Sequence, residues 1–468
     1  MRDVMPEVMP RTRTLFVSLL LLSIPVFAEH ALHVVVGITD TYLANHLVPT
    51  HGLIDDALDK AHATNAAAGA AVGSIAYVLW FLGLVVAGIG TGATAIIARA
   101  TGSRHKRLAN KVAGQAILCA AIAGLVVGVT LYLCAGPIAR AAHLPADATD
   151  YFQQYVRILA WGLPFAVVMF TANACLRGSG DTITPAVAMM TVDVVNFVLS
   201  VGLMYGMFYL PKLGFNGIAI GTCVAYIVGG VLQFVVLLWG RKNLKLYVHR
   251  LKPEWLTIKR ILRIGIPAGS EGVVWWVANF AVLSVVNTLG SVSATAHNLA
   301  IRVESFSFMS GFAVATAVAT LVGQKLGAGK PDEARRAAWL GFALGGGIMT
   351  LLGVTFILFS TQWASLFTDD PAVQKLTAQC LFATGFIQCG MAAAINFGSA
   401  LRGAGDTVAA MLASLSSVIV FRCVAVLVAG QLGFSLGQIW IILSAELFIR
   451  GLLMMSRFAS GKWVHAKV

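Results

Sequence analysis

Apolar runs recur along the whole chain and are separated by short polar segments. Each run has about 20 residues or more, which is the length that an α-helix needs to cross the hydrocarbon core of a bilayer. The runs are continuous, whereas the strands of a membrane β-barrel would alternate polar and apolar residues. The pattern therefore predicts an all-α integral membrane protein. We expect twelve transmembrane helices, at 15–46, 67–98, 112–136, 156–175, 184–210, 215–239, 262–289, 294–322, 337–360, 377–400, 408–430 and 433–456.

One short sequence occurs twice. Leu-Arg-Gly-Ser-Gly-Asp-Thr at 176–182 returns as Leu-Arg-Gly-Ala-Gly-Asp-Thr at 401–407, an offset of 225 residues. A second repeat, Ile-Pro-x-x-x-Glu, ends at Glu29 and again at Glu271, an offset of 242, so the first half carries 17 more residues. We place this insertion in an exported loop at 47–66. Self-similarity over so long a period indicates a duplicated unit.

The duplication predicts two lobes of six helices each. Six is an even number, so both copies enter the membrane from the same side and are parallel repeats, related by a pseudo-twofold axis along the membrane normal. We assign 1–240 to an N-lobe with spans 1–6, 241–261 to a basic cytoplasmic linker, and 262–468 to a C-lobe with spans 7–12. In the linker, Pro253-Glu254-Trp255 is typical of a helix start. That segment lies either on the membrane surface or in solvent.

The charge distribution predicts the orientation. The net charge of +13 would suit a nucleic-acid-binding protein, but the positions of the basic residues favour a different explanation. Of the Lys and Arg residues, 26 lie at the termini and the even-numbered junctions between spans, and only five lie at the other junctions. The positive-inside rule then places both termini in the cytoplasm. Cleavage of a signal peptide after Ala28 would reverse every loop and contradict this pattern.

Composition supports the membrane class and excludes several functions. The chain is 58% hydrophobic and 11% charged, against about a quarter charged in a soluble domain. The seven cysteines lie in apolar runs without paired spacing, which predicts neither disulfides nor a metal site. No phosphate-binding loop and no catalytic cluster is present, so we expect neither ATP hydrolysis nor an enzyme. The insertion region holds three His and three Asp in no tetrahedral pattern, at His46, His51, Asp55, Asp56, Asp59 and His62.

The duplicated motif is typical of a hairpin between two helices. Its glycines allow a helix to end with positive φ, and Asp181 or Asp406 can cap the next helix. Arg177 and Arg402 would favour the end of the preceding helix and the lipid phosphates. We therefore interpret the motif as a cytoplasmic turn, not as a binding site.

The motifs of both halves resemble the multidrug and toxic compound extrusion (MATE) family. The similarity rests on the two Arg-Gly-x-Gly-Asp-Thr motifs, on Asp40-Thr41 at the end of span 1, and on matching segments after spans 2 and 8 at 92–102 and 315–329. It covers nearly the whole chain. It implies a two-lobed exporter of twelve helices that exchanges inward protons or sodium ions for outward organic compounds, often cationic.

The resemblance also suggests which residues bind the coupling ion. Asp40 matches the span-1 aspartate of the family, and Asn196 matches a span-5 asparagine, with Ser200 where the family has an acidic or amide residue. The sodium-type branch has an acid in span 7 where this chain has Trp275, and another in span 10 where it has Met391. Proton coupling through the N-lobe is therefore favoured over sodium coupling.

Ionisable residues inside the predicted spans are candidates on physical grounds, because a charge in the bilayer costs about 3 kcal/mol unless it is paired or hydrated. Glu29, His33 and Asp40 can share one face of span 1. Asp193 and Asn196 lie three residues apart on span 5 and can meet Asp40 across the N-lobe. The ion-coupling candidates are Asp40, Glu29, Asp193, Asn196 and Glu271.

Other polar residues are weaker candidates. Glu29 and Glu271 follow matched prolines and either bind an ion or cap the backbone groups that proline frees. Arg302 and Glu304 in span 8 are interpreted as a pair that keeps charge neutral, and Arg422 and Glu446 could pair similarly. The candidates for a substrate cavity are His33, Trp275, Trp276, Arg302 and Glu304, with Phe280 as a further aromatic residue.

These observations lead to one hypothesis and one alternative. Protonation of a buried carboxylate removes the charge that holds a cationic substrate, so proton entry and drug release exclude each other. The alternative is a lipid-linked sugar flippase, which would need extra spans and a cationic central cavity. We expect a monomer in the plasma (inner) membrane that contacts lipid and small organic substrates. H+ or Na+ would be the coupling ion, and we expect no other cofactor, no metal and no nucleic acid.

Overall fold

The computed structural model describes the backbone at 5–48, 56–141, 145–242, 244–248 and 251–466. Some side chains within these ranges, among them that of His33, lie outside the described part. The elements are α1 (Met5–Asn45), α2 (Asp56–Gly102), α3 (Lys106–Ala141), α4 (Ala146–Gly178), α5 (Ile183–Tyr205), α6 (Phe215–Trp239), α7 (Trp255–Thr288), α8 (Ser291–Gly327), α9 (Pro331–Leu358), α10 (Ser360–Ser365), α11 (Pro371–Gly385), α12 (Gln388–Ala404), α13 (Thr407–Ser417), the π-helix η2 (Val418–Ala425), α14 (Val426–Gln431), α15 (Leu436–Ala459) and the 3-10 helix η3 (Lys462–His465).

The predicted spans coincide with these helices. Ten of the described helices are long and apolar enough to cross a membrane, and α11 with α12 forms an eleventh span that is bent by 59° at its break. The remaining predicted span, 67–98, lies within α2. That helix already begins at Asp56, so the prediction of an exported loop was wrong for residues 56–66, which are helical. Part of the insertion thus lengthens α2 at its start relative to α8, its counterpart in the second repeat.

Local sequence explains several helix ends. The side chain of Asp370 accepts a hydrogen bond from the backbone N–H of Ala372 and caps α11. Ser435 and Gln438 form a capping box at the start of α15. It supplies acceptors for N–H groups of the first turn that have no partner within the helix. Gly405 ends α12 with a φ of 85°, a conformation that favours glycine. The repeated glycine of the duplicated motif is thus required by its turn.

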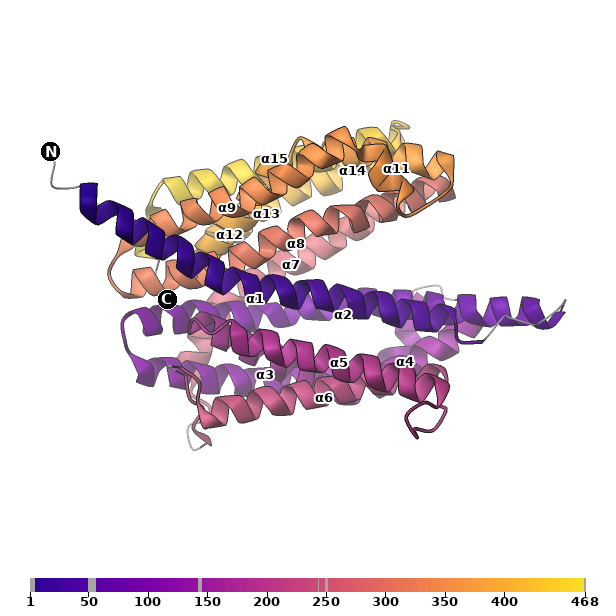
Figure 1. Ribbon diagram of the computed structural model, residues 1–468, viewed down its shortest axis with the longest axis horizontal. Helices are drawn as coiled ribbons and strands as arrows, with labels where there is room; N and C mark the ends of the chain where they lie inside the picture. The colour runs from indigo at the N-terminus through magenta and orange to yellow at the C-terminus, as the bar shows by residue number, and fades with distance from the viewer. Residues whose placement is uncertain (1–4, 49–55, 142–144, 243, 249–250, 467–468) are drawn as a thin grey trace.

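The helices form two bundles (Figure 1). Helices α2–α6 make up one bundle and α7–α15 the other, with α1 running along both. We call the end of the molecule that carries the two Arg-Gly-x-Gly-Asp-Thr motifs the motif end, and the opposite end the far end. The start of α1 and the end of α15 both lie at the motif end, whereas the bundles spread apart toward the far end.

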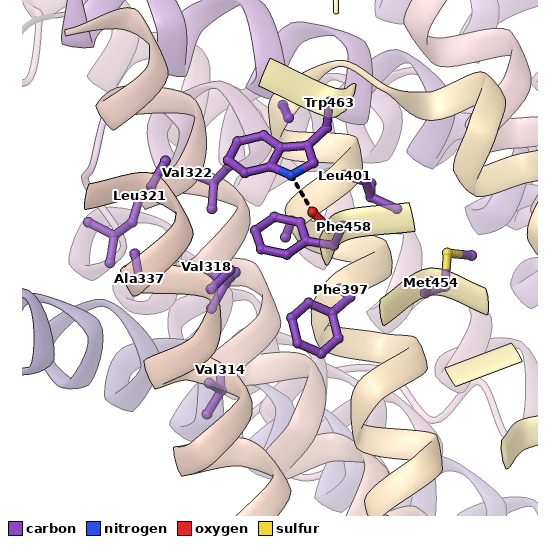
Figure 2. Packing of buried hydrophobic residues seen from close by; sticks show 14 of the residues in the cluster. Val314, Val318, Leu321, Val322, Ala337, Phe397, Leu401, Met454, Phe458 and Trp463 are labelled. Carbon is purple, nitrogen blue, oxygen red and sulfur yellow. Dashed lines mark hydrogen bonds between the residues drawn. The ribbon is translucent and has the colours of Figure 1, made fainter. Parts of the chain in front are cut away.

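Helix α1 changes partners along its length. Near the motif end, Leu15 and Leu19 are buried in a core with residues of α8, α9, α12 and α15. Near the far end, Leu43 and Ala44 are buried in a core with residues of α2–α4 and α6. The core that receives Leu15 and Leu19 is centred on a group of aromatic rings that includes Phe397 and Phe458 (Figure 2). The first helix of the chain therefore joins the two bundles.

Helix α7 makes the reciprocal exchange. Ile261 and Ile264, near the motif end, are buried among residues of α2, α3, α4 and α6. Val282 and Val286, toward the far end, are buried with residues of α8, α11, α14 and α15. The first helix of each repeat thus belongs to its own lobe at the far end and to the other lobe at the motif end.

The bundles meet at the motif end through backbone contacts. A Cβ on Gly102 would lie 1.9 Å from the carbonyl oxygen of Gln324, and a Cβ on Gly327 would lie 2.0 Å from that of Arg99. Arg99 Nη2 also donates to Ala404 O over 2.8 Å. Gly102 and Gly327 are equivalent positions of the two repeats. At each position, the absence of a side chain leaves room for the backbone of the other repeat.

This close approach predicts the effect of adding one methyl group. Gly102→Ala or Gly327→Ala forces the helices apart by roughly 1.5 Å, because non-bonded carbon atoms need about 3.5 Å. We expect the distance between spin labels at the exposed positions Arg104 and Lys330, in a cysteine-free background, to lengthen. Gly347→Ala is the control, because its added Cβ meets nothing within 4 Å. An unchanged label distance in both glycine variants would show that the contact does not hold the lobes together.

Candidate functional site

The N-lobe encloses a group of hydroxyl and amide side chains. Asn196 of α5 donates from Nδ2 to Thr222 Oγ1 of α6 over 2.9 Å. The hydroxyl of Tyr155 on α4 lies 3.2 Å from the same Thr222 oxygen. Oδ1 of Asn196 and the hydroxyl of Ser200, both buried, have no hydrogen-bond partner among the described residues. Three helices thus aim polar groups at one region of the lobe.

The two N-lobe aspartates lie around this group. Asp40 of α1 is half-buried and interacts electrostatically with the hydroxyls of Tyr155 and Tyr226. Asp193 of α5 is buried and interacts with Tyr226 as well. The structure therefore brings Asp40 of span 1 and Asp193 and Asn196 of span 5 to one group of hydroxyls, those of Tyr155, Thr222 and Tyr226. The side chain of His33 lies outside the described residues.

Glu29 lies apart from this cluster. It is eleven residues from Asp40 on the same helix, about 16 Å at 1.5 Å per residue. Its carboxylate forms an ion pair with Arg177 of α4. Arg177 lies in the last turn of α4, as predicted, but the prediction that it faces lipid phosphates was wrong, because its guanidinium is paired with a buried carboxylate. Glu29 and Arg177 tie the first helix of the N-lobe to the duplicated motif.

Glu271 has the same arrangement in the C-lobe. Arg402 Nη1 of α12 lies 3.1 Å from Glu271 Oε2 and 3.3 Å from Oε1. The lipid-phosphate prediction was therefore wrong for Arg402 too. Both members of each pair occupy duplicated positions, so the repeats build the same contact twice. Repetition of the Glu and of the Arg was the signal in the sequence that could have predicted these pairs.

The aspartates of the duplicated motif behave differently from each other. Asp181 accepts hydrogen bonds from Thr184 N over 3.2 Å and from its hydroxyl over 2.7 Å, which confirms the predicted capping. Asp406 makes no side-chain capping bond to α13. It pairs instead with Arg457 at 2.9 Å, because α15 ends beside the motif.

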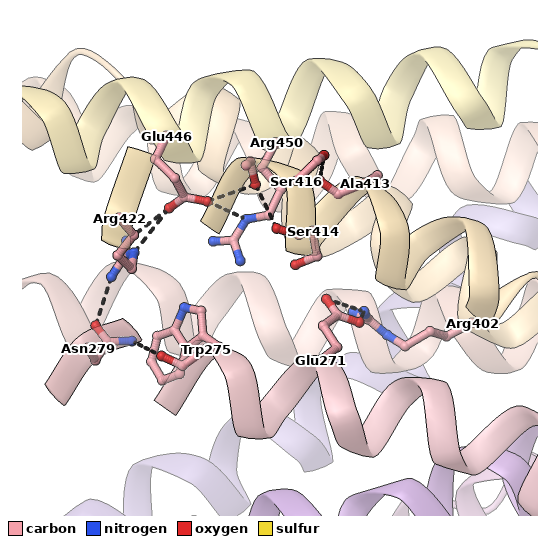
Figure 3. Close-up of polar contacts among 11 residues, drawn as sticks. Glu271, Trp275, Asn279, Arg402, Ala413, Ser414, Ser416, Arg422, Glu446 and Arg450 are labelled. Carbon is pink, nitrogen blue, oxygen red and sulfur yellow. Dashed lines mark hydrogen bonds and ion pairs between the residues drawn. The ribbon is translucent and has the colours of Figure 1, made fainter. Parts of the chain in front are cut away.

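A charged network lies deeper in the C-lobe (Figure 3). Arg422, on the π-helical segment η2, binds Glu446 Oε2 through Nη2 at 3.0 Å and through Nε at 3.3 Å, so the predicted pair is confirmed. Arg450 Nε lies 3.3 Å from the other oxygen of the same carboxylate. Arg450 was not predicted to belong here, because its position near the end of span 12 made it one of the basic residues of the terminus.

The aromatic candidates of α7 have separate surroundings. The guanidinium of Arg422 lies over the ring of Trp275 at 5.9 Å, and its Nη1 donates to Asn279 Oδ1 over 2.7 Å. Trp276 stacks on Phe280 with ring centroids 6.0 Å apart. Phe280 is itself exposed. Trp275 thus belongs to the charged network, whereas Trp276 and Phe280 form a separate aromatic pair.

The predicted pairing of Arg302 with Glu304 was wrong. Arg302 is exposed and Glu304 is buried, since residues two apart point to different faces of a helix. No ion pair between described residues joins them. Glu304 accepts a hydrogen bond from Thr384 Oγ1 over 2.6 Å. His297, also on α8, accepts a hydrogen bond from the indole of Trp440 over 3.1 Å.

The two helical lobes duplicate each other and enclose charged side chains within apolar bundles. These features are typical of a two-lobed, multi-pass membrane transporter. A family model described as MatE matches residues 61–201 and 267–427. The chain belongs to the MatE family, as its motifs predicted. Members of this family are transporters and not enzymes.

Named relatives extend over most of the chain. A probable multidrug resistance protein NorM of Thermotoga maritima is 27% identical over 449 residues, which are 95% of this chain and 92% of the relative. A probable NorM of Xanthomonas axonopodis pv. citri is 25% identical over 400 residues, 85% of this chain and 83% of the relative. The similarity therefore includes both lobes.

Solved structures share the fold. The MATE transporter VcmN of Vibrio cholerae superimposes with a TM-score of 0.86 at 17% identity, over 97% of this chain and 99% of that one. A MOP superfamily transporter from Pyrococcus furiosus gives a TM-score of 0.85 at 20% identity, over 96% and 97%. The predicted two-lobed fold is confirmed.

The charged network of the C-lobe predicts a stability effect. Glu446→Gln leaves the guanidinium groups of Arg422 and Arg450 buried without their shared carboxylate, which we expect to cost about 3 kcal/mol. Denaturant unfolding in mixed micelles measures this loss. Glu254→Gln is the control, because the Lys111–Glu254 pair is well exposed and should contribute under about 1 kcal/mol. Equal losses in the two variants would show that water already screens the buried arginines.

Proposed function

We propose that the protein is a secondary active multidrug efflux transporter that exchanges inward H+ for outward organic, cationic compounds. The observation that carries the proposal is the N-lobe cluster, where Asp40 of one helix interacts electrostatically with the hydroxyls of Tyr155 and Tyr226, and Asp193 of another interacts with that of Tyr226. Carboxylates inside a span are functional candidates because they are costly to keep there. The names of the relatives support multidrug export as the role.

The proposed exchange follows from charge. With Asp40 ionised, the cluster is negative and attracts a cation between the lobes. A proton that enters from outside neutralises the carboxylate and weakens the hold on the substrate. The hydroxyls of Tyr155 and Thr222 and the amide group of Asn196 can each donate to a carboxylate or accept from a carboxylic acid, so the lobe need not rearrange when the carboxyl changes state. Proton and drug therefore occupy the site in alternation.

The arrangement of the lobes supports a state open to the outside. Interlobe hydrogen bonds lie at the motif end, where Thr320 Oγ1 donates to Arg177 O over 3.1 Å and Gln324 Nε2 donates to Gly178 O over 3.2 Å. The bundles spread apart at the far end (Figure 1). The distribution of basic residues favours a cytoplasmic motif end. We place the protein in the inner membrane with both termini in the cytoplasm, as a monomer without a resident cofactor.

Substitution of Asp40 tests the proposal. In liposomes that contain the purified protein, Asp40→Asn should abolish dye export driven by a pH gradient, because the variant can neither hold a cation nor bind the proton. Asp150→Asn, an exposed acid on α4, should retain export within about twofold.

Two results would contradict the proposal. Unchanged export by Asp40→Asn would remove this carboxylate from the mechanism. Export by the wild type that follows an imposed sodium gradient and ignores the pH gradient would exclude the proton as the coupling ion.

A further inference from the structure

The interior of the C-lobe holds a balanced set of charges. Three carboxylates, Glu271, Glu304 and Glu446, and three guanidinium groups, Arg402, Arg422 and Arg450, are buried or half-buried within its helices. Their formal charges sum to zero when all are ionised. Protonation of any one carboxylate would therefore give the set a charge of +1. Which carboxylate can take the proton depends on its neighbours.

Two of the three carboxylates are fixed by arginine. Glu271 binds Arg402 at 3.1 Å, and Glu446 binds Arg422 at 3.0 Å and Arg450 at 3.3 Å. A carboxylate in direct contact with a guanidinium group is stabilised in its ionised form. These two acids are therefore poorly suited to bind and release a proton during each cycle.

Glu304 has a different environment. It is buried, with 8% of its surface exposed, and it takes part in none of the ion pairs formed by the described residues. It accepts a hydrogen bond from the hydroxyl of Thr384 over 2.6 Å, and the side-chain amide of Gln388, 3.4 Å from the same hydroxyl, also interacts with it. Gln388 is in turn held by the hydroxyl of Ser307 at 2.6 Å. Hydroxyl and amide groups can serve both a carboxylate and a carboxylic acid, because each can donate or accept.

The site is built at a broken helix. Thr384 stands next to the end of α11 and Gln388 begins α12, and the two helices are bent by 59° at this break. Both side chains are fully buried and face α8. Interrupted transmembrane helices are where transporters bind their coupling ions, since the break exposes polar groups inside the lobe.

Charged and titratable groups of other helices also act on Glu304. Arg422 of η2 and Cys380 of α11 interact with it electrostatically. Arg422 already binds Glu446, so Glu304 adds a second, longer-range negative charge near this arginine. Protonation of Glu304 removes that charge without breaking an ion pair.

We propose that Glu304 is a second proton-binding site of the exchange cycle, located in the C-lobe and held by Thr384 and Gln388. The inference rests on the proposed function and extends it to two protons per substrate. Uptake of the proton turns this set of charges in the C-lobe from neutral to +1, which repels a cationic substrate, while the N-lobe cluster loses one negative charge. The direct 2.6 Å hydrogen bond between Thr384 and Glu304 leaves no space between these two oxygens for a sodium ion.

The number of coupled protons tests the inference. Proteoliposomes with the membrane potential clamped at zero and a pH difference of one unit should sustain a substrate gradient of about 100-fold with two protons and about 10-fold with one. We expect about 100-fold for the wild type and about 10-fold for Glu304→Gln, which keeps the shape of the side chain. Ser310→Ala, which removes a buried hydroxyl of α8 that donates only to its own helix, should match the wild type.

The outcomes separate this inference from the proposed function. A 100-fold gradient in Glu304→Gln would overturn the second site while leaving Asp40 in place. Failure of Asp40→Asn to affect export would instead overturn the proposed function. If Glu304→Gln does not fold, Thr384→Val tests the second site instead. This variant retains the carboxyl group of Glu304 and removes the hydrogen bond that Thr384 donates to it. The pH dependence of export should shift in that variant, and an unchanged pH dependence would exclude Glu304.

Discussion

A charge inside a membrane bundle must be paired, and this constraint explains most of the polar architecture. Glu29 pairs with Arg177 and Glu271 with Arg402, so each lobe fixes its first helix to its fourth span by the same contact. Glu446 is shared by two arginines. Carboxylates bound in this way support the structure. Glu304 instead accepts a hydrogen bond from the hydroxyl of Thr384, and our proposals assign the changes of charge to Glu304 and Asp40.

Duplication explains where the lobes meet. Gly102 and Gly327, at equivalent positions, each accommodate the backbone of the other repeat, and α1 and α7 each cross to the opposite core near the motif end. Closure there therefore depends on backbone shape and hydrogen bonds, whereas the changes of charge that we propose lie in the separate interiors of the lobes. In our proposal, these changes leave the Glu–Arg pairs intact.

The fold could be predicted from the sequence, because apolar runs and a repeated motif determine the helices and their symmetry. The assignment of coupling roles to Glu29 and Glu271 treated each acid alone, although the repeats also duplicated their arginine partners. The predicted pairing of Arg302 with Glu304 was wrong because side chains two residues apart on a helix point to different faces. Thr384 and Gln388 could not be recognised, since their role depends on a bend that the apolar pattern of 377–400 does not show.

The most direct test of this account is infrared difference spectroscopy of the protein in lipid between high and low pH, which detects carboxyl groups as they take up protons. We predict signals that disappear in Asp40→Asn and in Glu304→Gln and that persist in Glu271→Gln. Carboxyl signals that vanish in Glu271→Gln and persist in the other two variants would contradict the claim that ion-paired acids are structural and hydroxyl-bound acids carry the proton.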